Sequence, residues 1–223
     1  MTTTSDPSAP QAIRWPIVLA IGVAVAGVCG LVAAGGDVPG WEASIFHAIN
    51  DLPDWLRPIM WVFQLAGLLL VPLVVAVGAV IAHKFRLAIA LVALIPLKLF
   101  VEKLMVKQLV ERQRPGTSIC DGDATCGDFR DVPLEGLSFV SGHAIISWAV
   151  ATLLWAYLPG RWKWLPVGVA VANSVARVYL GAHNPLDVVG GGAIGVAIGA
   201  VLMMLIGLLP AHLDGVRREP ERV

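Results

Sequence analysis

Charge is scarce in this sequence: 16 Lys and Arg and 16 Asp and Glu make up 14% of its 223 residues. A soluble domain of this length typically carries charge on a quarter of its residues, or about 56. A soluble enzyme is therefore disfavoured, because its surface would expose large apolar patches. The 57% hydrophobic content excludes a disordered chain, and the net charge of zero excludes nucleic-acid binding through bulk positive charge. The composition is typical of a protein embedded in a lipid bilayer.

Long apolar segments take the place of the missing polar surface. A helix needs about 20 apolar residues to cross a bilayer. Six segments approach or exceed this length, at residues 15–36, 58–82, 87–106, 144–160, 164–182 and 188–211. They predict an all-α fold, a bundle of six transmembrane helices forming one domain over residues 15–211. The first segment could instead be a cleaved signal peptide, but its 22 uncharged residues are long for one.

Basic residues near the segment ends predict the orientation of the chain. Eight lie at one set of ends and six at the other, and three of these six are assigned to chemistry below. The excess places both termini in the cytoplasm, with residues 1–14 as a disordered tail and residues 212–223 as a second tail. Segments 35–57, 107–142 and 181–187 then face outside, which predicts an integral protein of the plasma (inner) membrane.

Two of the three cysteines, Cys120 and Cys126, lie in one of these outer segments. They would be free thiols if this loop were cytoplasmic, but a disulfide agrees better with the predicted orientation. A metal site is disfavoured because no His accompanies the pair. Cys29, within the first apolar segment, is interpreted as a small apolar side chain.

Ionisable groups at a membrane edge are costly, so three polar clusters on the predicted outer side are functional candidates. The first runs from Lys107 to Pro115. Lys107 and Arg114 are seven residues apart, so a helix that extends beyond the membrane would direct both toward one anion. Pro115 would end that helix. The alternative is a group of basic side chains that snorkel at a helix end.

The second cluster is Ser141-Gly142-His143, directly before the fourth apolar segment. Ser141 is a natural N-cap, and the free N–H groups at a helix start bind anions. Gly142 would let an oxygen approach closely, and His143 could protonate a leaving group. Ordinary capping beside an interfacial histidine is the alternative.

The third cluster runs from Arg177 to Asp187 and surrounds the start of the sixth segment, where Pro185 is expected near the first helical position. His183 and Asp187 are four residues apart. The carboxylate can hold one imidazole N–H and leave the other nitrogen as a nucleophile or base. The alternative is a structural salt bridge at a helix start.

Together the clusters form the ordered pattern Lys-x6-Arg-Pro, Ser-Gly-His and Arg-x5-His-x3-Asp. The chain therefore resembles the type 2 phosphatidic acid phosphatase superfamily, in its membrane branch of lipid phosphate and polyprenyl pyrophosphate phosphatases. Two positions depart from the family pattern. Val140 stands where Pro usually precedes Ser-Gly-His, and Ala176 stands where Ser usually precedes Arg177. These changes affect no group needed for the chemistry, but they could alter rate and substrate preference.

The resemblance implies metal-independent hydrolysis through a phosphohistidine, with no cofactor. His183 would attack phosphorus while Asp187 orients its ring. His143 would protonate the departing oxygen and then activate water. The phosphate-binding groups would be Lys107, Arg114, Arg177, Ser141 and Gly142.

The substrate implied by the family is a phosphorylated membrane lipid, and a polyprenyl pyrophosphate or polyprenyl phosphate derivative is favoured. Phosphatidylglycerophosphate or phosphatidic acid is the next alternative, followed by phosphoryl transfer to an acceptor alcohol. A non-enzymatic, lipid-binding scaffold with a relic site is disfavoured because all six family site residues are present. The oligomeric state stays open, with a homo-oligomer as one alternative.

Three features lie outside this pattern. Lys98 and Glu102 are four residues apart in the third segment, and a buried structural ion pair is favoured over a polar path beneath the site. The outer stretch Asp37–Arg57 is interpreted as an interfacial amphipathic segment, either a lip for lipid headgroups or a plain connector. Glycines at every fourth position of the sixth segment predict close helix packing, within the chain more than between copies.

Overall fold

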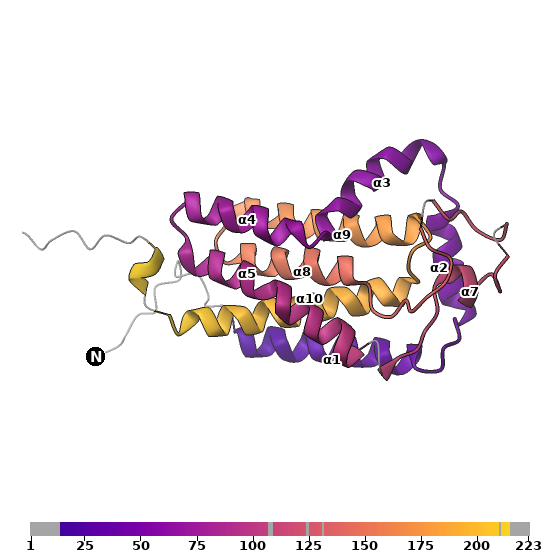
Figure 1. The fold of residues 1–223 in the computed structure, drawn as a ribbon, viewed down its shortest axis with the longest axis horizontal. Coiled ribbons are helices and arrows are strands. Elements are labelled where there is room, and N and C mark those ends of the chain that lie inside the picture. Colours follow the sequence, from indigo (N-terminus) through magenta and orange to yellow (C-terminus); the bar gives the residue numbers. More distant parts are fainter. Residues whose placement is uncertain (1–13, 107–108, 124, 131, 210, 215–223) are drawn as a thin grey trace, which may run out of the picture.

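A computed structural model of the chain describes residues 14–106, 109–123, 125–130, 132–209 and 211–214. This described part is helical and contains no strand. Its one isolated β-bridge joins Gln113 to Leu137. The helices form an elongated bundle, with shorter helices gathered at one end (Figure 1).

The helices along the bundle coincide with the six predicted segments. They are α1 (Trp15–Ala33), α3 (Arg57–Gln64) followed by α4 (Leu70–Ile81), α5 (Phe85–Leu99), α8 (Gly142–Trp155), α9 (Trp164–Tyr179) and α10 (Pro185–Gly207). By length and composition, α1 and α10 can each cross a membrane, and the pair α3–α4, bent by 68°, would be a third span. The all-helical fold is as predicted, whereas six crossings stay a prediction.

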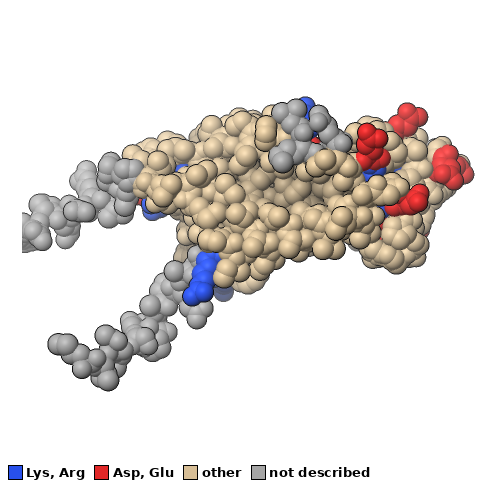
Figure 2. Space-filling model, turned by 90° about the horizontal axis from the view of Figure 1, so that it is seen from below, with Lys and Arg blue, Asp and Glu red and all other residues tan. Residues whose placement is uncertain are grey.

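Apolar side chains cover the outside of the bundle. Leu31 on α1 is 81% exposed and Ile81 on α4 is 73% exposed. Figure 2 shows a long central surface with few charged side chains, and acidic side chains gathered at one end. Such a surface suits contact with hydrocarbon, which is why the sequence contains so little charge.

The third segment changes its helical geometry part-way along. Pro96 lies inside α5 and cannot donate a backbone hydrogen bond. From Phe100 to Val106 the chain continues as a π-helical segment. Lys98 and Glu102 lie on either side of this transition, and both side chains are buried. They form the ion pair expected from their spacing.

The predicted continuation of this helix to Pro115 is wrong. Residues 110–114 are not helical, and Pro115 is instead the first residue of the short helix α7 (Pro115–Ser118). A proline disfavours helical geometry in the residue before it, and Arg114 accordingly has extended backbone angles. Helical spacing therefore does not bring Lys107 and Arg114 to one face. Lys107 itself lies outside the described residues.

The glycines of α10 bring it close to α8. A Cβ atom at Gly191 would lie 2.6 Å from the Ser141 carbonyl oxygen, and one at Gly199 would lie 2.7 Å from Thr152 Cβ. The glycine spacing thus serves packing within the chain. As a consequence, the start of α8 lies directly beside the start of α10.

Helix α2 (Gly40–Asn50) and α7 cover one end of the bundle (Figure 1). The stretch interpreted as amphipathic therefore contains a helix, and its inward face buries Glu42, Phe46 and Asn50. Asn50 Nδ2 donates to the Tyr179 carbonyl at the end of α9, at 2.9 Å. Trp41, on the other face, is 53% exposed. Helix α2 is thus packed on the bundle while an aromatic side chain faces outward.

Candidate active site

The second and third polar clusters meet where α8 and α10 begin. Ser141 is the N-cap of α8, and its hydroxyl accepts a hydrogen bond from the Ala144 N–H at 3.5 Å. Its own N–H donates to the Asp187 carbonyl at 3.0 Å. Asn184 caps α10 ahead of Pro185, and its N–H donates to the Asp187 carboxylate at 2.7 Å. Two helix starts thus lie side by side.

Two arginines bring positive charge to the same place. Arg114 Nη1 donates to the Ala182 carbonyl at 2.9 Å, next to His183. Burial lowers the pKa of the Arg114 guanidinium, while the nearby Asp187 carboxylate raises it. The guanidinium groups of Arg114 and Arg177 lie close enough to repel each other. An anion between them would relieve this repulsion.

Arg177 has one N–H donor that is available for a ligand. Its side chain is buried, and its Nη1 donates to Gln64 Oε1 at the end of α3 at 2.7 Å. Its Nε has no hydrogen-bond partner within the described residues. A buried donor without a partner is costly, so an oxygen of a bound phosphate would satisfy it.

His183 and Asp187 are coupled less directly than their spacing predicts. His183 Nδ1 lies 3.8 Å from Asp187 Oδ2, which is too long for a hydrogen bond. The Ser138 hydroxyl lies 3.3 Å from Nδ1 and donates to the same carboxylate oxygen. Ser138 therefore connects the two side chains. Sequence reasoning missed this residue, which stands only three positions before Ser141.

Asp187 is held in turn by a second group that sequence reasoning missed. Arg112 Nη1 lies 3.4 Å from Asp187 Oδ1 and donates to Glu42 Oε1 at 3.0 Å, while its Nη2 donates to the other Glu42 oxygen. Glu42 Oε1 also accepts the Leu186 N–H, at 2.8 Å, in the first turn of α10. Arg112, Glu42 and Asp187 are each 0% exposed.

His143 lies within electrostatic reach of Arg177 and His183. Its backbone and ring pack against Gly67, at the turn between α3 and α4. It also borders a cavity of about 400 Å³ that extends toward Leu68, Leu69 and Leu70. The break between α3 and α4 therefore creates space beside the predicted general acid.

Gly142 is confined by the Lys98–Glu102 ion pair. A Cβ atom at Gly142 would lie 2.8 Å from Lys98 Nζ and 2.7 Å from Glu102 Oε1. The sequence suggested that this glycine admits an anion. Its tight packing against the ion pair is a further reason why a larger residue would not fit.

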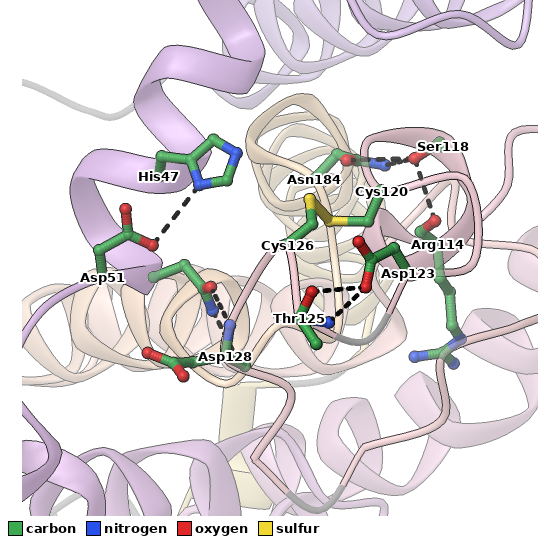
Figure 3. Close-up of a disulfide and its surroundings, with 11 residues drawn as sticks. His47, Asp51, Arg114, Ser118, Cys120, Asp123, Thr125, Cys126, Asp128 and Asn184 are labelled. Carbon is green, nitrogen blue, oxygen red and sulfur yellow. Dashed lines mark hydrogen bonds and ion pairs between the residues drawn. A yellow bond between two sulfur atoms is a disulfide. The ribbon is translucent and has the colours of Figure 1, made fainter.

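The loop after α7 contains a disulfide between Cys120 and Cys126, with the Cα atoms 5.5 Å apart. Figure 3 shows Ser118 between Arg114 and Asn184: its hydroxyl donates to the Arg114 carbonyl at 3.0 Å and accepts from Asn184 Nδ2 at 3.2 Å. The disulfide therefore closes the loop directly beside the residue that caps α10.

The same loop carries an acidic side chain, Asp123 (Figure 3). The hydroxyl and the N–H of Thr125 both donate to its carboxylate, and these hydrogen bonds lower the pKa of Asp123. The carboxylate is thus kept ionised within the loop and outside the site.

The PAP2 superfamily model matches residues 84–209, more than half of the chain. The chain belongs to the PAP2 superfamily. The matched region contains the two histidines, Asp187 and both site arginines, whereas Glu42 lies before it.

Among curated relatives, a decaprenylphosphoryl-5-phosphoribose phosphatase of Mycobacterium tuberculosis is 38% identical over 100 residues. This match covers 44% of the present chain, and the chain spans about half (50%) of the length of that relative.

Two solved structures share the fold. One is the first transmembrane PAP2-type phosphatidylglycerolphosphate phosphatase from Bacillus subtilis, with a TM-score of 0.65 and 21% identity over 86% of this chain and 98% of that chain. The other is LpxE from Aquifex aeolicus, with a TM-score of 0.58 and 23% identity over 72% of this chain and 93% of that chain.

Proposed function

We propose that this PAP2 protein is an integral-membrane lipid phosphatase that acts through a phosphohistidine. The observation that carries the proposal is the convergence of two histidines, two arginines and two helix starts on one place, where Arg177 Nε lacks a partner among the described residues. Phosphoryl transfer depends mainly on positioning and on charge stabilisation. The proposed phosphate-binding groups are Arg114, Arg177, Ser141, Gly142 and Lys107.

His183 is the proposed nucleophile. It forms a bond to phosphorus as the bond to the leaving oxygen breaks. Ser138 and Asp187 keep its Nδ1 side engaged, and Asp187 stabilises the positive charge that develops on the ring. Arg112 and Glu42 fix the Asp187 carboxylate in turn.

His143 is the proposed general acid and base. It donates a proton to the leaving oxygen and then takes one from the water that hydrolyses the phosphohistidine. The leaving group is the lipid, so the lipid must lie beside His143. The cavity toward Leu68, Leu69 and Leu70 supplies an apolar wall for its chain.

The favoured substrate is a polyprenyl pyrophosphate or a polyprenyl phosphate derivative. The name of the mycobacterial relative denotes a polyprenyl lipid substrate, and a cavity with leucines on one wall suits an isoprenoid chain. Phosphatidylglycerophosphate, phosphatidic acid and phosphoryl transfer to an alcohol are the outcomes against which this proposal is tested.

The proposed topology has six membrane crossings, both termini in the cytoplasm and the site at the outer face of the plasma membrane. The distribution of basic residues and the disulfide in the loop beside the site support this orientation. Reporter fusions after residue 214 and within the loop 121–130 would test it. A cytoplasmic loop reporter would contradict it.

The activity itself is tested on the full chain purified in detergent, by phosphate release from a panel of lipid phosphates. We expect the highest kcat/KM with a polyprenyl substrate, and no loss of activity with a chelator. His183→Ala should abolish release from every substrate. Activity of that variant equal to the parent would refute the phosphohistidine route. A phosphorylated alcohol formed from an added acceptor would identify a transferase instead.

A further inference from the structure

The cavity beside His143 has a mixed lining. Lys98 and His143 supply its ionisable groups, and Leu68, Leu69, Leu70 and Ile146 supply apolar side chains. A lipid with a polar linkage beside the reacting phosphate and a hydrocarbon chain matches this mixed lining.

The Lys98 ammonium would be poorly stabilised by contact with a hydrocarbon chain alone. The Lys98 side chain is 9% exposed, and its Nζ lies 2.8 Å from the position that a Cβ atom on Gly142 would take, at the first residue of α8. A buried ammonium is costly unless it is paired and hydrogen-bonded. Glu102 supplies the ion pair, but an ammonium has three N–H donors. Oxygen atoms of a ligand in the cavity could accept the others.

The position of Lys98 relative to the chemistry indicates which part of the substrate it meets. Arg114 donates to the carbonyl next to His183, where the attacked phosphate is proposed to bind. His143 lines the cavity together with Lys98, and it is also within electrostatic reach of Arg177 and His183. Because His143 is the proposed proton donor to the leaving oxygen, a group bound in this cavity belongs to the leaving part of the substrate.

We infer that Lys98 binds a second phosphoryl group of the lipid, next to the phosphate that is removed. The inference rests on the proposed phosphatase function and deepens it. It favours lipid diphosphates, or lipids with a phosphodiester a few bonds from a phosphomonoester, over simple lipid monophosphates. The shared chemistry is an anionic phosphoryl group in the leaving part.

With a diphosphate substrate, His183 bonds to the terminal phosphorus, and the bond from that phosphorus to the bridging oxygen breaks. The bridging oxygen leaves on the lipid monophosphate and takes the proton of His143. Water then cleaves the nitrogen–phosphorus bond and yields inorganic phosphate. Lys98 stabilises the negative charge on the departing lipid monophosphate.

The test compares a prenyl diphosphate with the prenyl monophosphate of equal chain length, by initial rates on the detergent-purified full chain. With Lys98→Met, kcat/KM for the diphosphate should fall roughly tenfold to a hundredfold, the effect of losing a hydrogen bond to a charged group. The value for the monophosphate should change by no more than a few-fold. Lys98→Arg should retain the preference for the diphosphate. Lys103→Met, which alters an exposed lysine of the adjoining π-helical segment, is the matched control and should change neither value.

Removing Lys98 alone takes one cation away from the buried Glu102 and could impair folding. The variant Lys98→Met/Glu102→Gln removes both charges and should show the same selective loss. Equal losses on both substrates in both variants would overturn the inference, as would no loss on either. A prenyl alcohol as the dominant product of the diphosphate in a single turnover would also overturn it.

A failure of the proposed function would look different. The parent protein would then release no phosphate from either substrate, or His183→Ala would remain active. Binding of a non-hydrolysable prenyl methylenediphosphonate would still report on Lys98 in that case. Binding that is equal in the parent and in Lys98→Met would refute the second phosphoryl site by itself.

Discussion

Two buried ion pairs flank the site, and they differ in their surroundings. Arg112 and Glu42 are completely enclosed, and the guanidinium reaches Glu42 and Asp187 together. Lys98 and Glu102 form the second pair, and Lys98 lines a cavity. The planar, multi-donor guanidinium suits a fixed arrangement, whereas an ammonium is a compact charge that can meet a ligand. The enclosed pair is therefore suited to holding the nucleophile, and the cavity-lining pair to meeting the leaving group.

The largest change in activity is expected from substitution of His143, the residue proposed to protonate the leaving group. His143→Gln should lower kcat for lipid substrates by about 10²–10⁴-fold, the usual contribution of a general acid. An aryl phosphate with an acidic leaving group needs little protonation, so its hydrolysis should fall far less. Steady-state rates on both substrates check this. Equal losses on the two substrates would assign His143 to phosphate binding instead.

The pH profile of the same variant separates the two sides further. The parent should give a bell-shaped profile, because His183 must be unprotonated and His143 protonated. Activity then falls at low pH as His183 gains its proton and at high pH as His143 loses its proton. In His143→Gln the alkaline limb should disappear while the acid limb stays. Two unchanged limbs would contradict the assigned roles.

A smaller effect is expected from the enclosed pair. Arg112→Met leaves Glu42 and Asp187 buried without their cation, which should lower kcat by about a hundredfold, the effect of a misplaced catalytic group. KM should change little. Breaking a buried pair should also cost about 3–5 kcal/mol of stability, seen as a lower thermal midpoint in detergent. Glu42→Gln/Arg112→Met should recover part of the stability but not kcat.

Arg130→Met is the matched control for Arg112. Arg130 is also buried at this end of the bundle, where it donates to the Tyr179 carbonyl at 2.7 Å and pairs with Asp54 at 3.0 Å. It does not contact Asp187 in the described structure. We expect a stability loss with kcat within a few-fold of the parent. A loss of kcat equal to that of Arg112→Met would reduce Arg112 to a structural role.

The smallest effect is expected from the disulfide, which lies outside both pairs. It joins cysteines six positions apart, and closing so short a loop contributes about 2 kcal/mol in the chain-entropy estimate. Cys120→Ser/Cys126→Ser should lower the thermal midpoint and leave kcat within a few-fold. Reduction of the parent should reproduce the result. A hundredfold loss of kcat would show that the loop positions Asn184 and α10 far more strongly.

Sequence patterns predicted many of the helices and helix starts, because these depend on residues close together in the chain. The six apolar segments coincide with the helices of the bundle, and Ser141 and Pro185 stand at the helix starts that their chemistry favours. The Lys98–Glu102 pair follows from the helical spacing. The prediction that helical spacing directs Arg114 into the site was wrong. Arg114 lies in extended chain before Pro115, so no helical face places it there.

The sequence by itself determined that the chain belongs in a membrane, and it predicted which residues carry phosphoryl chemistry. Scarcity of charge and short, ordered motifs are enough for both. Only the tertiary structure decided which side chains support them. Ser138 and His183 are 45 positions apart, and Arg112 and Glu42 are 70 apart. Such contacts depend on how α2, α8 and α10 pack at one end of the bundle, and no periodicity along the chain encodes them.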